Sequence, residues 1–201
     1  MKHSSITPCF TPGTRIATDR GLQFVERVCR GMRVVTRDNG LARVEWVGRR
    51  TVSYDELEID TELRPVLIHA HALGQGRPTR DMLVSPSHRL LVGPEQAFLA
   101  IDEDEALVAA RHLVDHWRIR QAEMLGVSYI HILCDQHQVI LADGAWTETF
   151  HPDDQTMRGL GNSQRRELIE LFPEIETIGA SRRFPAARTV LGQGFTRGFR
   201  G

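Results

Sequence analysis

Short runs of apolar residues, separated by glycine, proline, aspartate and serine, recur along residues 9–150. The clearest pattern is a hairpin, in which residues 33–36 precede Asp38-Asn39-Gly40 and residues 41–47 follow it. Apolar and polar residues alternate on both sides of this turn, as they do in a hairpin with one buried face. Together with the shorter runs, this pattern predicts an all-β domain. The shorter runs are residues 65–70, 82–84, 90–92, 129–134 and 139–142.

A weak internal repeat divides this β-rich region in two. Residues 28–34 align with residues 113–119, and an apolar stretch precedes each copy, at residues 22–25 and 106–110. Each copy is predicted to form a strand, a short helical turn and a second strand. Duplicated β-subdomains of this kind would give a pseudo-symmetric body.

The pattern changes after Phe150. Residues 151–154 form a breaker and capping cluster, and residues 164–172 place apolar side chains on one helical stripe. Beyond Pro173 the chain is rich in arginine, glycine and proline, which predicts a loosely held tail. The predicted organisation is a short leader, a β-domain, and a linker with a helix and a flexible tail, at residues 1–8, 9–150 and 151–201.

Composition narrows the class of function. The chain has 201 residues, 41% of them hydrophobic, and a net charge of −1, so neither nucleic acid nor a membrane surface is expected as a partner. No apolar run is long enough for a membrane span, and the N-terminus lacks the apolar core of a secretory signal. We therefore expect cytoplasmic synthesis, with signal-less secretion left open. The three cysteines, an odd number, argue against a disulfide framework.

Three segments combine residues that can carry nucleophilic or acid–base chemistry. Cys9 opens the β-region beside a tight Pro-Gly turn, although a buried small hydrophobe is the more ordinary role for one cysteine. Ser85 and His88 lie across a turn between two apolar runs, so they can converge, unless they only satisfy backbone groups. His137 enters a strand that ends at Asp143-Gly144, which is also an ordinary hairpin signal.

In this order, the three segments resemble the Hint domain, the self-processing module of hedgehog and intein proteins. Residues 9–40 resemble the start of a hedgehog autoprocessing domain, with CFTPGTRIATDRG followed by VERVCRGMRVVTRDNG. Residues 85–92, SPSHRLLV, resemble the family's Thr-x-x-His block, and residues 139–150, VILADGAWTETF, resemble its closing strands. The similarity is greatest to bacterial Hint domains that lack the splicing ending. It implies a β-rich horseshoe of two duplicated subdomains, here followed by a short C-terminal helix.

The resemblance also implies a reaction. Cys9 would attack the carbonyl of Pro8 and convert the Pro8–Cys9 bond into a thioester, which water or a small nucleophile would then open. His88 would protonate the departing nitrogen, and Ser85, at the family's threonine position, would hold the scissile bond. His137 would move the thiol proton. This single-turnover autoproteolysis needs no cofactor and no metal.

Several features qualify this reaction. Asp143 is a second candidate to move the thiol proton, although the hairpin turn also explains it. The ring of Pro8 crowds the acyl carbon, and only eight residues precede Cys9, so the acyl donor is either this short segment or a missing upstream partner protein. Asn162-Ser163 is interpreted as a helix cap and not as a splice junction, so ligation of flanking segments is not expected.

Other readings of the same residues remain open. The first is an inactive Hint fold that serves as a binding or structural module. A zinc site could use His112 and His116, at helical spacing, or His69 and His71, but the repeat places His116 at the position of a turn glycine. A cysteine hydrolase acting on other molecules would need a substrate cleft that the sequence does not indicate.

Overall fold

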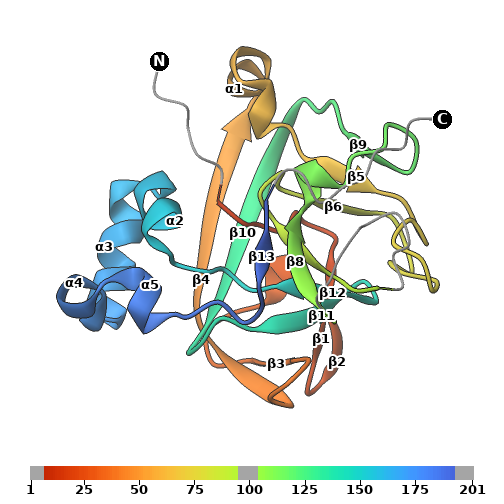
Figure 1. Cartoon of the computed structure of the whole chain (residues 1–201). Coiled ribbons are helices and arrows are strands. Elements are labelled where there is room, and N and C mark those ends of the chain that lie inside the picture. The colour runs from red at the N-terminus through yellow and green to blue at the C-terminus, as the bar shows by residue number, and fades with distance from the viewer. Residues whose placement is uncertain (1–6, 95–103, 193–201) are drawn as a thin grey trace.

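The computed structural model describes residues 7–94 and 104–192 of the chain. In these residues a ten-stranded sheet curls around the core, a three-stranded sheet covers one end, and four short helices follow in sequence (Figure 1). The first half contains β1 (Arg15–Thr18), β2 (Gly21–Phe24), β3 (Arg33–Val35), β4 (Leu41–Ser53), α1 (Tyr54–Ile59), β5 (Val66–Ile68), β6 (Met82–Val84) and β7 (Arg89–Val92). The second half contains β8 (Ala106–Ala109), β9 (Ile119–Gln121), β10 (Gly126–Cys134), β11 (Val139–Ala142), β12 (Ala145–Glu148), α2 (Asp154–Gly159), α3 (Asn162–Leu171), α4 (Glu174–Ile178), α5 (Ala180–Arg183) and β13 (Val190–Leu191).

The strand order confirms the predicted all-β class. The large sheet runs β10-β4-β3-β1-β11-β12-β7-β8-β13, with β2 paired to β1, and the small sheet runs β6-β5-β9. The predicted hairpin is β3 and β4, which pair antiparallel from Arg33 opposite Arg43 to Val35 opposite Leu41. No helix in the described part of the chain is long and apolar enough to cross a membrane.

The internal repeat is visible in the backbone. The first copy runs from β2 through the 3-10 turn η1 (Val25–Arg27) to β3, and the second runs from β8 through η3 (Ala110–His112) to β9. Gly31 and His116, which the alignment places opposite each other, both have a left-handed backbone, with φ of 92° and 68°. The duplication therefore extends to a turn geometry that ordinarily favours glycine.

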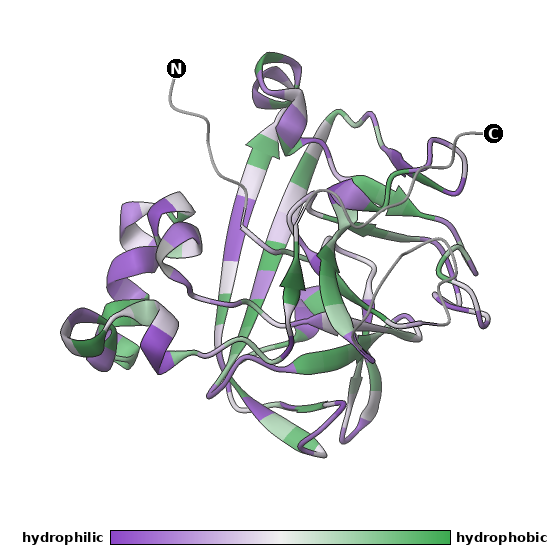
Figure 2. Ribbon diagram, in the orientation of Figure 1, coloured by the Kyte–Doolittle hydropathy of each residue, from purple (hydrophilic) through white to green (hydrophobic). Residues whose placement is uncertain are grey.

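The strands that follow the two copies, β4 and β10, form a long antiparallel ribbon. β4 and β10 pair antiparallel from Ser53 opposite Gly126 to Val44 opposite Cys134. Alternate residues of β4 from Ala42 to Gly48 are buried, and Figure 2 shows hydrophobic and hydrophilic residues interspersed along the strand. This period of two is what a strand with one buried face requires. Trp46 and Gly48 share the buried face, and Gly48 lies directly opposite His131.

The C-terminal segment contains more structure than the single predicted helix. The Asp153 side chain accepts a hydrogen bond from Thr156 N at 2.7 Å and so caps α2. Gly161, and not Asn162, is the residue before α3. The apolar sides of these helices form one cluster with three residues of the β-domain, because none of the helices is long enough to be stable alone. The cluster contains Trp46, Leu133, Phe150, Met157, Leu160, Leu168, Phe172, Ile175, Ala180 and Phe184.

The chain then returns to the sheet. β13 pairs parallel with β8, through Val190 opposite Leu107 and Leu191 opposite Val108. Just before it, Arg188 donates to Asp38 at 2.6 Å and to Glu105 at 3.0 Å. Residues 1–6 of the predicted leader and 193–201 of the predicted tail lie outside the described residues.

Candidate active site

Phe10 ties the start of the β-domain to two strands. Its backbone N–H donates to Ile130 at 2.9 Å and its carbonyl accepts from Ile130 at 2.9 Å, while a second antiparallel bridge joins it to the last residue of β6. In an antiparallel bridge the residue before one partner lies beside the residue after the other. Cys9 is therefore placed next to Ser85 on one side and His131 on the other.

Ser85 holds the backbone around Cys9 at three points. The Cys9 N–H donates to Ser85 Oγ at 2.9 Å, and that hydroxyl donates to the Thr7 carbonyl at 3.0 Å. The Ser85 N–H donates in turn to the Cys9 carbonyl at 3.0 Å. The nitrogen of the Pro8–Cys9 peptide bond is thus fixed by a side chain that the sequence had assigned to the scissile bond.

His131 lies at the other side of the same peptide bond. Its Nδ1 is 3.0 Å from the Pro8 carbonyl oxygen and 3.3 Å from Cys9 Sγ. Its Nε2 is 3.4 Å from Thr7 Oγ1, and the thiol itself donates to the Thr7 carbonyl at 2.9 Å. One ring nitrogen therefore contacts both the thiol and the carbonyl that the thiol would attack.

Sequence reasoning did not find His131. The residue lies within residues 129–134, one of the short apolar runs that predict the β-domain. A histidine inside such a run must find a polar partner when buried, and this was the available signal. The partner is supplied by residues 7–9, whose register on β10 is set by Phe10.

Burial controls the protonation of both the Cys9 thiol and the His131 imidazole. Cys9 is 2% exposed, and burial raises the pKa of its thiol to about 12, although hydrogen bonds from Thr7 and Ser85 oppose this effect. Burial also lowers the pKa of His131 to about 4, against the hydrogen bond to the Pro8 carbonyl. At neutral pH the resting pair is therefore a neutral thiol beside a neutral imidazole, and the thiol needs a base before it can react.

His88 packs against Phe10, the residue that follows Cys9, with the centroids of the two rings 4.5 Å apart. Its Nε2 contacts the hydroxyl of Thr147, which donates to the Arg89 carbonyl at 3.1 Å, so Nε2 carries the proton. Its buried Nδ1 has no hydrogen-bond partner among the described residues. Burial lowers the pKa of His88 to about 4, so this nitrogen is a free lone pair at neutral pH.

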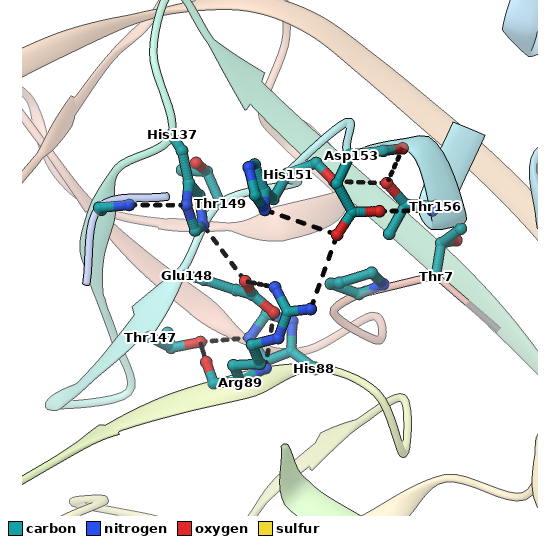
Figure 3. A network of polar contacts seen from close by, with 12 residues as sticks. Thr7, His88, Arg89, His137, Thr147, Glu148, Thr149, His151, Asp153 and Thr156 are labelled. Carbon is teal, nitrogen blue, oxygen red and sulfur yellow. Dashed lines mark hydrogen bonds and ion pairs between the residues drawn. The ribbon is translucent and has the colours of Figure 1, made fainter. Parts of the chain in front are cut away.

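His137 makes its hydrogen bonds away from Cys9. Its Nε2 is 3.2 Å from Glu148 Oε2, and its Nδ1 accepts from the Ala187 N–H at 3.0 Å. Its ring also stacks on His151, with centroids 4.3 Å apart and an angle of 8° between the planes (Figure 3). Because both ring nitrogens have other partners, His137 has none left for the thiol, and its contacts instead join the sheet to the C-terminal segment.

Asp143 lies in the turn between β11 and β12. It has a positive φ of 45° and is followed by Gly144 at 79°, which is the geometry that a two-residue hairpin turn prefers. Its carboxylate is 3.3 Å from Arg15 and 4.0 Å from Arg80. The structure brings Ser85 into direct contact with Cys9, but the contacts of Asp143 are with these two arginines.

Glu148 is the buried anion of the network in Figure 3. It accepts from the Arg89 backbone at 2.8 Å and from the Arg89 guanidinium at 3.0 Å, in addition to His137. Burial alone would raise the pKa of this carboxyl, but the hydrogen bond from His137 and the charge of Arg89 lower it overall. A carboxylate is thereby kept charged close to His88, whose protonated form it favours.

The histidines named as possible zinc ligands do not lie together on one helix or strand face. η3 ends at His112, and His116 follows in a turn, so the two do not share a helix face. β5 ends at Ile68, so His69 and His71 do not share a strand. The described residues contain no group of three or more histidine, cysteine or acidic side chains that could hold a metal ion.

Residues 8–154 match a family model described as the Hint domain. An intein-like domain from Clostridium thermocellum is 13% identical, with 73% of this chain and 99% of that one covered and a TM-score of 0.46. A DnaB intein from Synechocystis sp. PCC 6803 is 9% identical, with coverages of 71% and 99% and a TM-score of 0.46. The gp41-1 intein is 11% identical, with coverages of 71% and 98% and a TM-score of 0.41. No curated protein sequence gives a significant match.

Proposed function

Because the chain belongs to the Hint family, a family of self-processing domains, we propose that it cleaves its own Pro8–Cys9 bond by way of a thioester. The observation that carries this proposal is the position of His131 Nδ1, 3.3 Å from the thiol and 3.0 Å from the carbonyl oxygen of that bond. A nucleophile and its base within hydrogen-bond reach are the geometric requirement for covalent catalysis.

The first step is the attack of the thiol. The hydrogen bond to the Pro8 carbonyl places the imidazole proton on Nδ1, so Nε2, which is 3.6 Å from Cys9 Sγ, takes the proton of the thiol while the sulfur forms a bond with the carbonyl carbon of Pro8. The Nδ1–H already faces the oxygen of Pro8, where negative charge develops, so the same ring serves as base and as oxyanion donor. Ser85 meanwhile holds the Cys9 nitrogen, which keeps the peptide bond in place during the attack.

The second step breaks the bond between the Pro8 carbon and the Cys9 nitrogen. The leaving nitrogen needs a proton, and His88 delivers one from Nδ1 after taking it up from solvent. His131 later releases the proton that it took from the thiol, so the shift consumes no net proton. Water or a small nucleophile then opens the thioester and frees the upstream segment. The Asn-driven ligation of inteins is not part of this proposal.

The direct test is a fusion with a soluble reporter ahead of Thr7, carrying Pro8→Gly to relieve crowding at the acyl carbon. Incubation with dithiothreitol or hydroxylamine should release the reporter at the junction before Cys9, as measured by intact mass. The same fusion with Cys9→Ala should release none, because the nucleophile is gone. A Pro8→Gly fusion that stays intact under strong thiol would exclude the activity and leave the fold as a binding or structural module.

Ser85 provides a second prediction in the same fusion. Ser85→Ala leaves the Cys9 N–H and the Thr7 carbonyl buried without this partner, which costs about 1–3 kcal/mol for such groups. Release should slow, while Ser85→Thr, which keeps the hydroxyl, should release at least as fast as the parent. Equal rates for the alanine and threonine variants would remove Ser85 from the mechanism.

A further inference from the structure

We propose that Trp46 is a positioning residue for His131, and that Gly48 makes this possible by leaving room for the indole. The inference rests on the proposed self-cleavage, because it concerns the histidine that we assign as the base of that reaction. Among the described residues, the ring contacts of Trp46 are with His131 and Phe150, and its Nε1 has no hydrogen-bond partner. Its effect on the reaction is exerted through the orientation of the imidazole.

The arrangement follows from strand geometry. His131 on β10 pairs directly with Gly48 on β4, and Trp46 precedes Gly48 by two residues on the same buried face. A Cβ atom built on Gly48 would lie 2.1 Å from Cη2 of the indole, so the ring passes over the glycine. It reaches the imidazole of His131 at a centroid distance of 5.8 Å with 23° between the planes.

A second aromatic ring packs against the imidazole of His131. Phe150 meets His131 edge-on, with centroids 5.0 Å apart, and contacts Trp46 at 5.8 Å. Both aromatic residues belong to the cluster that α2–α5 complete with Leu168, Phe172 and the other apolar residues given above. The C-terminal helices, which lie almost entirely beyond the matched residues 8–154, therefore support the rings that hold His131.

The identity of the residue supports a role beyond filling space. Trp46 is 2% exposed, and its Nε1 has no hydrogen-bond partner among the described residues. A buried donor without a partner is unfavourable, and an aliphatic side chain would fill the volume without this cost. What an indole adds is a flat surface inclined by only 23° to the imidazole, and this fixes the plane in which Nδ1 meets both Cys9 and Pro8.

The test is Gly48→Ala in the full-length Pro8→Gly reporter fusion. The backbone of Gly48 is not in a left-handed conformation, so alanine is compatible with the strand, and the added methyl instead displaces the indole. Since a misplacement of about 1 Å can cost about 100-fold in rate, we expect thiol-induced release to slow by about 10- to 100-fold at an unchanged junction. Gly161→Ala is the matched control, since nothing lies within 4 Å of its Cβ position, and should release at the parent rate.

A double-mutant cycle separates positioning from general damage. If Gly48→Ala acts through the indole and the imidazole, it should have no further effect in a Trp46→Ala background or in a His131→Asn background. The inference would be overturned if Gly48→Ala slowed release by the same factor in these backgrounds as in the parent. An unchanged release rate in Gly48→Ala itself would also overturn it. A parent fusion that fails to cleave would count against the proposed function and not against the positioning.

The positioning has a readout that does not need cleavage. In the full-length protein, the ring ¹⁵N and ¹H signals of His131 should shift in Gly48→Ala, and the imidazole should titrate at a higher pH than in the parent. Gly161→Ala should leave both unchanged. Identical His131 signals and titration in Gly48→Ala and the parent would refute the proposal, whether or not the fusion processes itself.

Discussion

Replacing His131 with asparagine should slow thiol-induced release from the Pro8→Gly fusion by about 10²–10⁴-fold, the usual contribution of an acid–base residue. The asparagine amide can still donate to the Pro8 carbonyl, but it cannot take the proton of Cys9. The loss therefore measures the base alone. The rate is followed by intact mass at fixed thiol concentration.

The pH dependence of the release rate should show that the His131→Asn variant lacks the step that removes the proton of Cys9. With a thiol pKa of about 12, the thiolate fraction of Cys9 rises about tenfold for each unit of pH below that value. Release by the His131→Asn variant should therefore rise steeply between neutral and alkaline pH and approach the parent rate. His88→Ala should stay slow, because alkaline pH removes the proton that the leaving nitrogen needs.

His137→Asn is the matched control for this experiment. Its ring nitrogens already contact Glu148 and Ala187, so its replacement should affect the docking of the C-terminal segment more than the base step. A base role for His137 would instead give the alkaline rescue that we assign to His131. That result, with a normal rate for His131→Asn, would reverse our assignment of the two histidines.

Glu148→Gln should lower the free energy of unfolding by about 3–5 kcal/mol, because it removes one partner of a buried ion pair. Arg89 then keeps only the more distant carboxylate of Asp153, at 3.9 Å, and the hydrogen bonds around His137 weaken. The measurement is chemical denaturation at neutral pH. Glu123→Gln is the control, since this exposed carboxylate is 3.8 Å from Arg64 and such pairs contribute at most about 1 kcal/mol.

The same pair makes stability depend on pH. The pKa of Glu148 is lowered in the fold, so its contribution is present above the ordinary range of a glutamate and is lost as the pH falls through the folded value. The difference in unfolding free energy between the parent and Glu148→Gln should therefore shrink at acid pH. A difference that stays constant, or a variant as stable as Glu123→Gln, would contradict the role of Glu148.

The β-domain could be predicted from local patterns. The hairpin of β3 and β4 follows from alternation around an Asn-Gly turn, and the repeat follows from similar apolar spacing in two segments. Each of these segments is short, and within it the period of apolar residues and the turn chemistry decide the structure. The extra helices α2, α4 and α5 could not be predicted in this way, because they are short and depend on packing against Trp46, Leu133 and Phe150.

The residues of the candidate site also differ in whether a local sequence pattern can predict them. Cys9 and Ser85 could be singled out because they stand beside turns with a recognisable spacing. The contact of His131 with Pro8 depends instead on the register of residues 8–10 against β10, which no local pattern encodes. The sequence instead assigns the thiol proton to His137, but the distant Ala187 occupies one of its nitrogens and Glu148 the other.

The parallel pairing of β13 with β8 bears on when the chain can act during its synthesis. The ribosome makes Cys9 early, but the strand that completes the sheet edge ends at Leu191, and the cluster behind His131 includes Phe184. A nascent chain that has reached only β12 lacks this support for the imidazole. A protein fused upstream should thus have at least the time needed to synthesise residues 9–191 in which to fold before the bond is cleaved, so the order of synthesis sets the earliest time of cleavage.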